Sequence, residues 1–183
     1  LQKLWKLLDE ADIVIGHNMK GFDTRKANAR FIMNGMKPPS PYKIVDTLLV
    51  ARQHFLFTSD KLGDLGKYLG LGSKIDTGGF QLWKACMEGN KQAWKKMVNY
   101  CKQDILLTEK VYYKLRPYMQ AHPNIGVYAD DDQLRCPKCA SQKLVKEGYV
   151  YTNVGKYQRY SCKGCGGWSK GRTNLRENKV ESV

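Results

Sequence analysis

Two C-x-x-C pairs near the C-terminal end restrict the possible folds of this chain more than any other feature. The four cysteines are Cys136, Cys139, Cys162 and Cys165. The pairs are separated by 22 residues, close to the spacing at which two short knuckles hold one tetrahedral Zn²⁺. No secretory signal is visible in the sequence, and without one, paired cysteines favour metal over disulfides. We therefore predict one structural Zn²⁺ bound by these four thiolates.

The residues between the knuckles alternate in a way that is typical of a β-hairpin. Residues 143–151 and 157–161 carry the alternation, with a turn near Gly155. A unit of this size has too little apolar core to fold without its ion. We predict a small β zinc ribbon over residues 135–175, followed by a basic, flexible tail at residues 176–183.

The charge of the chain favours a polyanionic partner. It carries 31 Lys and Arg against 17 Asp and Glu, and residues 133–183 hold 11 of the basic side chains but only 3 of the acidic ones. Basic residues there are interleaved with aromatic ones, so cations can neutralise phosphates while rings stack on unpaired bases. We expect Lys143, Arg159 and Arg172 to contact nucleic acid. The alternative is a ribbon that only folds and packs against the rest of the chain.

The first 118 residues alternate short apolar runs with helical patterns, which indicates an α/β domain. The predicted strands cover residues 13–16 and 43–45, and the predicted helices cover residues 23–34, 46–52 and 92–115, with a further helix capped by Ser59. Residues 119–134, with a proline, a glycine and three consecutive aspartates, are predicted to form a linker.

Several residues of this domain have plain structural interpretations. Asp46 follows a strand and is expected to cap the next helix. His17 is expected to be a hydrogen-bonded structural residue, and Cys86 and Cys101 are expected to be core thiols. The helix over residues 92–115 is expected to bury one face. That face comprises Trp94, Met97, Val98, Cys101, Ile105, Thr108, Val111 and Leu115.

Two pairs of polar residues in the domain are placed to act together. Asn18 and Asp23 follow the first predicted strand within a short turn. Tyr100 and Asp104 are four residues apart on the long predicted helix, so a phenol and a carboxylate lie side by side.

These residues resemble two sequence motifs of the DEDD exonucleases, which are RNase H-like nucleases. Asn18, Phe22 and Asp23 match the second motif, and Tyr100 and Asp104 match Y-x-x-x-D, the third motif of the tyrosine subclass. The VDTLLVAR and KLGDLGKYLGL segments are also similar, so the resemblance covers most of residues 1–116. It implies an RNase H-like fold and hydrolysis of phosphodiester bonds.

The resemblance also implies a site for two divalent ions, Mg²⁺ or Mn²⁺, about 3.5–4 Å apart. Mg²⁺ needs hard oxygen ligands, and clustered carboxylates supply them. By similarity, Asp104 ligates the ion that activates water, and Asp23 holds the second ion largely through water. Tyr100 orients the attacking water, because a phenol is a poor base at neutral pH. Asn18 and Phe22 are implied to contact the substrate.

The first motif of that family, Asp-x-Glu on the first strand, is missing from this sequence. Glu10-Ala11-Asp12 has a similar composition, but it lies at the start of the strand whose far end carries Asn18, roughly 15 Å away. We therefore expect residues 1–118 to be an RNase H-like domain that lacks its first strands, with the other two carboxylates either encoded upstream of Leu1 or lost. Residues 1–183 alone are expected to bind catalytic metal poorly and to be nearly inactive.

The predicted function is 3′→5′ exonuclease activity at DNA 3′ ends, with single-stranded DNA favoured and RNA as an alternative substrate. Two other functions fit the sequence: a non-catalytic nucleic-acid-binding protein with a degenerate nuclease fold, and an RNase H-like endonuclease acting on structured DNA. The segments HPNIGVY and YQRYSCKGCGGWSKGR resemble phage-encoded exonuclease-like proteins, which implies replication or recombination proteins as partners. No apolar run is long enough to span a membrane, so we expect a soluble protein in the cytoplasm, or in the host cytoplasm for a phage.

Overall fold

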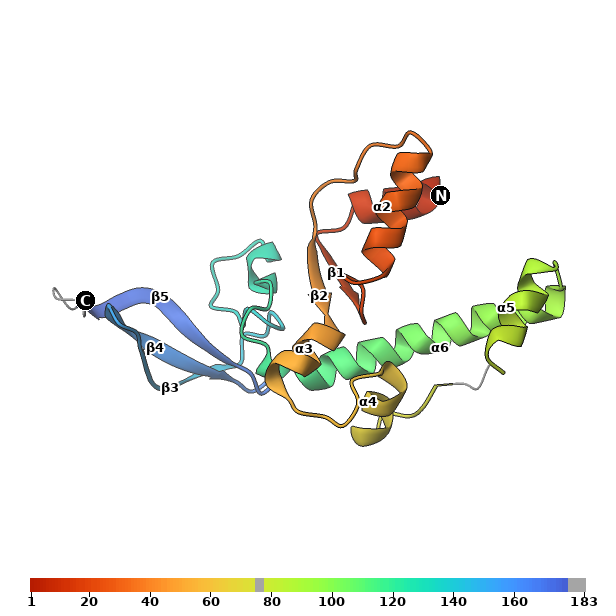
Figure 1. The fold of residues 1–183 in the computed structure, drawn as a ribbon. Helices are drawn as coiled ribbons and strands as arrows, with labels where there is room; N and C mark the ends of the chain where they lie inside the picture. Colours follow the sequence, from red (N-terminus) through yellow and green to blue (C-terminus); the bar gives the residue numbers. More distant parts are fainter. Residues whose placement is uncertain (75–77, 178–183) are drawn as a thin grey trace. The chain divides into compact units, whose positions relative to one another are not determined.

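The computed structural model describes residues 1–74 and 78–177 of the chain (Figure 1). The chain divides into two compact units, of which the first is Leu1–Leu115 and the second begins at Arg116. Most of the predicted tail, residues 178–183, lies outside the described residues. In the described part of the chain, no helix has both the length and the apolar composition needed to cross a bilayer.

The first unit contains a short parallel sheet of two strands. Strand β1 (Ile13–Gly16) pairs with β2 (Lys43–Asp46), residue for residue along both strands (Figure 1). Helix α1 (Gln2–Asp9) precedes the sheet, and helix α2 (Asp23–Met33) lies between the two strands in the chain. Parallel neighbours need such a crossover connection. Both predicted strands and the predicted helix between them are confirmed to within a residue.

Four helices follow the sheet in the first unit. They are α3 (Thr47–His54), α4 (Leu62–Tyr68), α5 (Phe80–Met87) and α6 (Lys91–Leu115). The sequence predicted three of them, and α5 was not predicted. The mixed α/β character of this unit agrees with the predicted fold class.

The two predicted helix caps have different outcomes. The Asp46 carboxylate accepts a hydrogen bond from the Leu48 N–H at 3.1 Å, so the predicted cap of α3 is confirmed. The predicted cap at Ser59 is wrong, because α4 begins at Leu62. The Ser59 hydroxyl instead donates to Asp64 Oδ2 at 2.6 Å, and so ties the preceding loop to the first turn of α4.

Helix α6 contacts different neighbours along its length. Near its start, a buried cluster joins it to α5, and further along it packs against α4, α3 and β1. Four side chains predicted to be inside are exposed: Trp94 (52%), Val98 (48%), Ile105 (68%) and Cys101. The helix instead buries Ala93, Met97, Leu107, Val111, Tyr112 and Leu115. Ala93 was not predicted to be inside, because the prediction followed the spacing of large apolar residues; it packs against α5. Cys86 is buried as predicted, whereas Cys101 is exposed, so its predicted core position is wrong.

The second unit contains an antiparallel sheet with the order β3-β4-β5. Its strands are β3 (Leu144–Tyr151), β4 (Gly155–Cys162) and β5 (Trp168–Glu177) (Figure 1). The hairpin of β3 and β4 is confirmed. Strand β5 was not predicted, and it continues two residues beyond the predicted end of the ribbon at residue 175.

Part of the segment predicted to be a linker is folded onto the first cysteine knuckle. One 3₁₀ helix, η1 (Arg116–Tyr118), lies just before this segment, and a second, η2 (Ile125–Tyr128), lies within it. The Ile125 N–H donates to the Pro137 carbonyl at 2.8 Å, and Asn124 caps η2 through the Gly126 N–H. Residues 124–128 are therefore part of the second unit and not a free connection.

Candidate functional site

Helix α6 presents Tyr100 and Asp104 one turn apart, and one lysine contacts both. Lys74 Nζ donates to Asp104 Oδ2 at 2.8 Å and to the Tyr100 hydroxyl at 3.1 Å. The Tyr100 ring packs against the buried cluster between α5 and α6, which fixes the direction of its hydroxyl. The structure thus brings together the two predicted residues on α6 and adds a cation that the sequence did not predict.

The second oxygen of Asp104 has a different environment. Asp104 Oδ1 is buried and has no hydrogen-bond partner among the described residues. A buried acceptor without a donor is costly, and the cost is larger for a charged group. A hard cation bound at this oxygen would remove that cost. Asp104 therefore has the property expected of a metal ligand at one oxygen, while Lys74 holds the other.

The Asp23 side of the site is held by the turn that follows β1. Asp46 fixes this turn, because its carboxylate accepts from the Asn18 N–H at 2.8 Å and from the Lys20 N–H at 2.9 Å. Asn18 has a left-handed backbone conformation (φ 60°), which asparagine tolerates better than most residues. Asp23 is exposed as the first residue of α2, and Phe22 is also exposed (55%). The structural role of Asp46 thus includes the turn as well as the predicted cap.

The first unit contains a cleft of about 1360 Å³, which is lined both by the turn after β1 and by helix α6. Asp23 and Asp104 both line it, together with Asn18 and Lys74, whereas Tyr100 and Phe22 are not among its lining residues. In the part of the chain that the structure describes, no three carboxylate or histidine ligand atoms in this cleft come close enough together to hold an ion. The structure therefore brings two predicted carboxylates to one cleft without forming a closed metal cage.

His17 has a structural role beside this cleft. The Thr47 hydroxyl donates to the Gly16 carbonyl at 3.1 Å and lies 2.9 Å from His17 Nδ1, so it can accept the Nδ1 proton. Burial lowers the pKa of His17 below its usual value, and the nearby Asp46 carboxylate offsets only part of this effect. A neutral histidine that orders the junction of β1 and α3 agrees with the structural interpretation of the sequence.

Lys74 is the residue of the site that sequence reasoning missed. It follows a glycine-rich segment and belongs to none of the described helices or strands, so no periodicity marked it. Burial acts to lower the pKa of Lys74, but hydrogen bonds to Asp104 and Tyr100 outweigh it and raise that pKa. Lys74 is therefore a charged ammonium group beside Asp104 and Tyr100.

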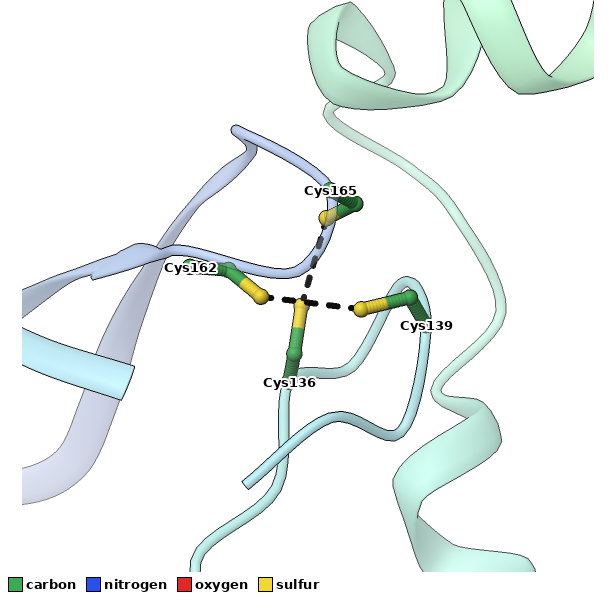
Figure 2. A group of neighbouring side chains, drawn as sticks. All are labelled: Cys136, Cys139, Cys162 and Cys165. Atoms are coloured by element: carbon green, nitrogen blue, oxygen red, sulfur yellow. Dashed lines mark hydrogen bonds between the residues drawn. The ribbon is translucent and has the colours of Figure 1, made fainter. Parts of the chain in front are cut away.

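The four paired cysteines form a second candidate site in the second unit (Figure 2). Their four sulfur atoms lie within 4.8 Å of one another, with Cys136 to Cys165 at 3.8 Å and Cys139 to Cys162 at 3.6 Å. These distances are far longer than a disulfide bond. Four ligands about 2.3 Å from a tetrahedral Zn²⁺ lie about 3.8 Å apart. The arrangement fits a Zn²⁺ bound by four thiolates, as the sequence predicted.

The backbone around the second knuckle favours a thiolate. Burial acts to raise the pKa of Cys162, but N–H groups of Cys165 and Gly164 point at its sulfur and bring the pKa down to about 7. Burial raises the pKa of Cys139 to about 12. Cys162 can thus become a thiolate near neutral pH, whereas the thiolate of Cys139 needs a bound cation to stabilise it.

The surface of the ribbon pairs cations with aromatic rings. Arg159 lies 4.8 Å from the ring centre of Trp168, and Lys170 lies 4.5 Å from that of Tyr157. The three predicted nucleic-acid contacts of the ribbon are Lys143, Arg159 and Arg172, and all are exposed. Arg159 also donates to the Glu147 carbonyl at 2.8 Å, which fixes its guanidinium group. Cations and aromatic rings therefore lie side by side on β4 and β5.

Comparison with known proteins gives one family. A family model described as the RNase H superfamily matches residues 1–116, which is almost the whole first unit. In the same comparisons no curated protein and no solved structure matched the chain.

Proposed function

The chain belongs to the RNase H superfamily, and on that premise we propose that it acts as a metal-dependent 3′→5′ exonuclease of the DEDD type on DNA 3′ ends. The family supports a nuclease-type hydrolase that acts on nucleic acid. The observation that carries the finer proposal is the pair on α6: Asp104 has a buried, unpartnered oxygen in the cleft that Asp23 also lines, and Tyr100 stands beside it.

In this proposal each residue has a separate task. Mg²⁺ or Mn²⁺, when bound, would supply the charge needed to activate a water near neutral pH and to stabilise the leaving 3′ oxygen. Asp104, whose Oδ1 is buried and unpartnered, would hold one ion, and Asp23 at the start of α2 would hold the second. Tyr100 orients the attacking water with a hydroxyl that the α5–α6 cluster fixes in place. Asn18 and Phe22 contact the 3′-terminal nucleotide from the exposed turn.

The zinc ribbon has a supporting task in the same proposal. Its exposed Lys143, Arg159 and Arg172 neutralise backbone phosphates, and the rings beside the cations stack on unpaired bases. We expect salt to weaken binding strongly, because phosphate contacts release counterions. A ribbon that served only to support the fold would not need exposed aromatic side chains such as Trp168 (48%).

The proposed reaction is tested with the protein that the complete reading frame encodes. A single-stranded DNA labelled at its 3′ end should release mononucleotides when Mg²⁺ is added. Asp104→Asn should lower the rate by at least about 100-fold, because it removes the negative charge of a proposed metal ligand at the reacting centre. Glu109→Gln is the matched control, since Glu109 is exposed, lines the same cleft and lies on the same helix. The control should keep its activity within about twofold.

Other products would point to the other candidate functions. Internal cuts in structured DNA, with Asp104 still required, would favour an endonuclease. DNA binding without cleavage would favour a non-catalytic binding protein. Two observations favour the non-catalytic binding protein: Lys74 contacts Asp104, and no third ligand group comes close in the described part of the cleft.

A further inference from the structure

The ammonium group of Lys74 contacts Asp104, the carboxylate that is proposed to bind a metal ion. We propose that Lys74 is an internal counter-ion, which competes with a divalent metal ion for Asp104 and keeps Tyr100 engaged until the metal binds. This inference rests on the proposed function, because it takes Asp104 to be a metal ligand. It adds a positioning residue and a metal-dependent exchange to that function.

The structure accommodates Lys74 in a specific way. Its stem passes over α4 at Gly63, where an added Cβ would lie only 3.3 Å from Lys74 Cγ. A glycine at this position leaves room for the lysine. The ion pair is partly buried, with the side chains of Lys74 and Asp104 36% and 22% exposed. Lys74 is therefore an exposed lysine whose stem packs against α4 and whose ammonium group contacts Asp104.

One carboxylate cannot serve both cations equally well. Lys74 Nζ lies 2.8 Å from Asp104 Oδ2, and the buried Oδ1 belongs to the same carboxyl group. A divalent ion on Oδ1 would lie a few ångströms from the ammonium group, where like charges repel appreciably at a partly buried site. Either Lys74 weakens metal binding from its present position or it leaves Asp104 when the metal arrives.

The exchange would also release Tyr100. Lys74 donates to the Tyr100 hydroxyl at 3.1 Å, so its departure frees an acceptor position on that oxygen. The cleft lies directly beside Lys74, and a displaced ammonium group there would face a negatively charged phosphate. Lys74 would then have two arrangements, one on Asp104 and one displaced toward the cleft. Metal and substrate would both favour the displaced arrangement, so the binding of one would help the binding of the other.

The test measures Mn²⁺ binding by electron paramagnetic resonance to the same protein as in the nuclease assay, after its cysteine site has been loaded with Zn²⁺. Lys74→Met should bind Mn²⁺ about tenfold more tightly than the unmodified protein, since one positive charge is removed beside the ligand. Lys74→Gln, which keeps a hydrogen-bond donor without the charge, should give the same direction. Lys67→Met is the matched control: it removes an equal charge from an exposed position on α4 and should change the affinity less than twofold.

Asp104→Asn separates this inference from the proposed function. Introduced into Lys74→Met, it should abolish the gain in Mn²⁺ affinity. If both Lys74 variants are folded by circular dichroism and bind Mn²⁺ no more tightly than Lys67→Met, the competition is refuted, while a loss of Mn²⁺ in Asp104→Asn alone would leave the proposed metal ligand standing. If the gain persists without the Asp104 carboxylate, the ion binds elsewhere, and Asp104 as the metal ligand of the proposed exonuclease is refuted too.

Discussion

The two units of this chain depend on different sources of stability. The first unit buries large apolar side chains from several helices, among them Phe31, Leu65, Val111 and Leu115. In the described part of the second unit, the buried hydrophobic residues are Met119 and two of the paired cysteines, Cys136 and Cys162. Hydrophobic burial is thus available to one unit and almost absent from the other. A sheet of three strands with so little core needs another source of free energy, and the cysteine site is positioned to supply it.

The largest effect should follow from breaking the cysteine site. Cys162→Ser, or removal of Zn²⁺ by a chelator, should unfold the second unit, because a structural Zn²⁺ contributes on the order of 10 kcal/mol to folding. Hydrogen exchange should show lost protection in β3, β4 and β5 and unchanged protection in α4 and α6.

The control for that experiment is Cys101→Ser, since Cys101 is exposed on α6 and lies outside the cysteine site. Metal analysis should give one Zn²⁺ per chain for the control and none for Cys162→Ser. Equal protection of β3 to β5 with and without Zn²⁺ would show that the sheet has a source of stability other than the ion.

A smaller effect, confined to the first unit, should follow from a cavity in its core. Leu65 is completely buried on α4, so Leu65→Ala should lower the free energy of unfolding by about 2–5 kcal/mol. Zinc content should not change. Ile105→Ala on α6, where the side chain is 68% exposed, should cost less than about 1 kcal/mol. Chemical denaturation followed by tryptophan fluorescence measures both, and a large cost at Ile105 would contradict the burial of α6 described above.

The sequence predicted those parts of the fold that depend on local patterns. The β-branched run of β1, the carboxylate cap at Asp46 and the two C-x-x-C knuckles each carry their structural reason within a few residues. The prediction failed where a local structure depends on a residue far away in the sequence. The inward face of α6 is set by contacts with α5 and α4, and Ser59 bonds to a side chain in α4 instead of capping the helix.

The same distinction applies to the candidate site. Tyr100 and Asp104 are four residues apart on one helix, so the sequence could place them side by side. Asp23 reaches their cleft through the fold of the whole unit. Lys74 was missed because it follows an irregular glycine-rich segment, and its contacts with Gly63 and Asp104 join residues far apart in the sequence. The roles proposed for Asp23, Tyr100 and Asp104 remain predictions for the experiments above.

The smallest of these effects should come from Lys138, which links charge to the cysteine site. Lys138 is buried within the first knuckle and donates to the Pro117 carbonyl at 2.6 Å. Burial lowers its pKa, and negative charge at Cys165 and Cys136 acts in the opposite direction. Four thiolates with one Zn²⁺ carry a net charge of −2, so an ammonium group beside them stabilises the loaded site. Lys138→Met should therefore weaken Zn²⁺ binding by about three- to tenfold, measured by competition with a chromophoric chelator.

Lys163→Met provides the comparison for that measurement. Lys163 lies next to Cys162 but is exposed, and its ammonium group is paired with Glu147 Oε1 at 3.1 Å. Solvent and the carboxylate screen its charge, so the affinity for Zn²⁺ should change less than twofold. If both variants lose affinity equally, the basic surface as a whole and not the buried ammonium group would support the cysteine site. A loss of affinity confined to Lys138→Met would show that the buried ammonium group stabilises the bound Zn²⁺. Since the second unit has little apolar core, this charge would then contribute to its stability through the metal.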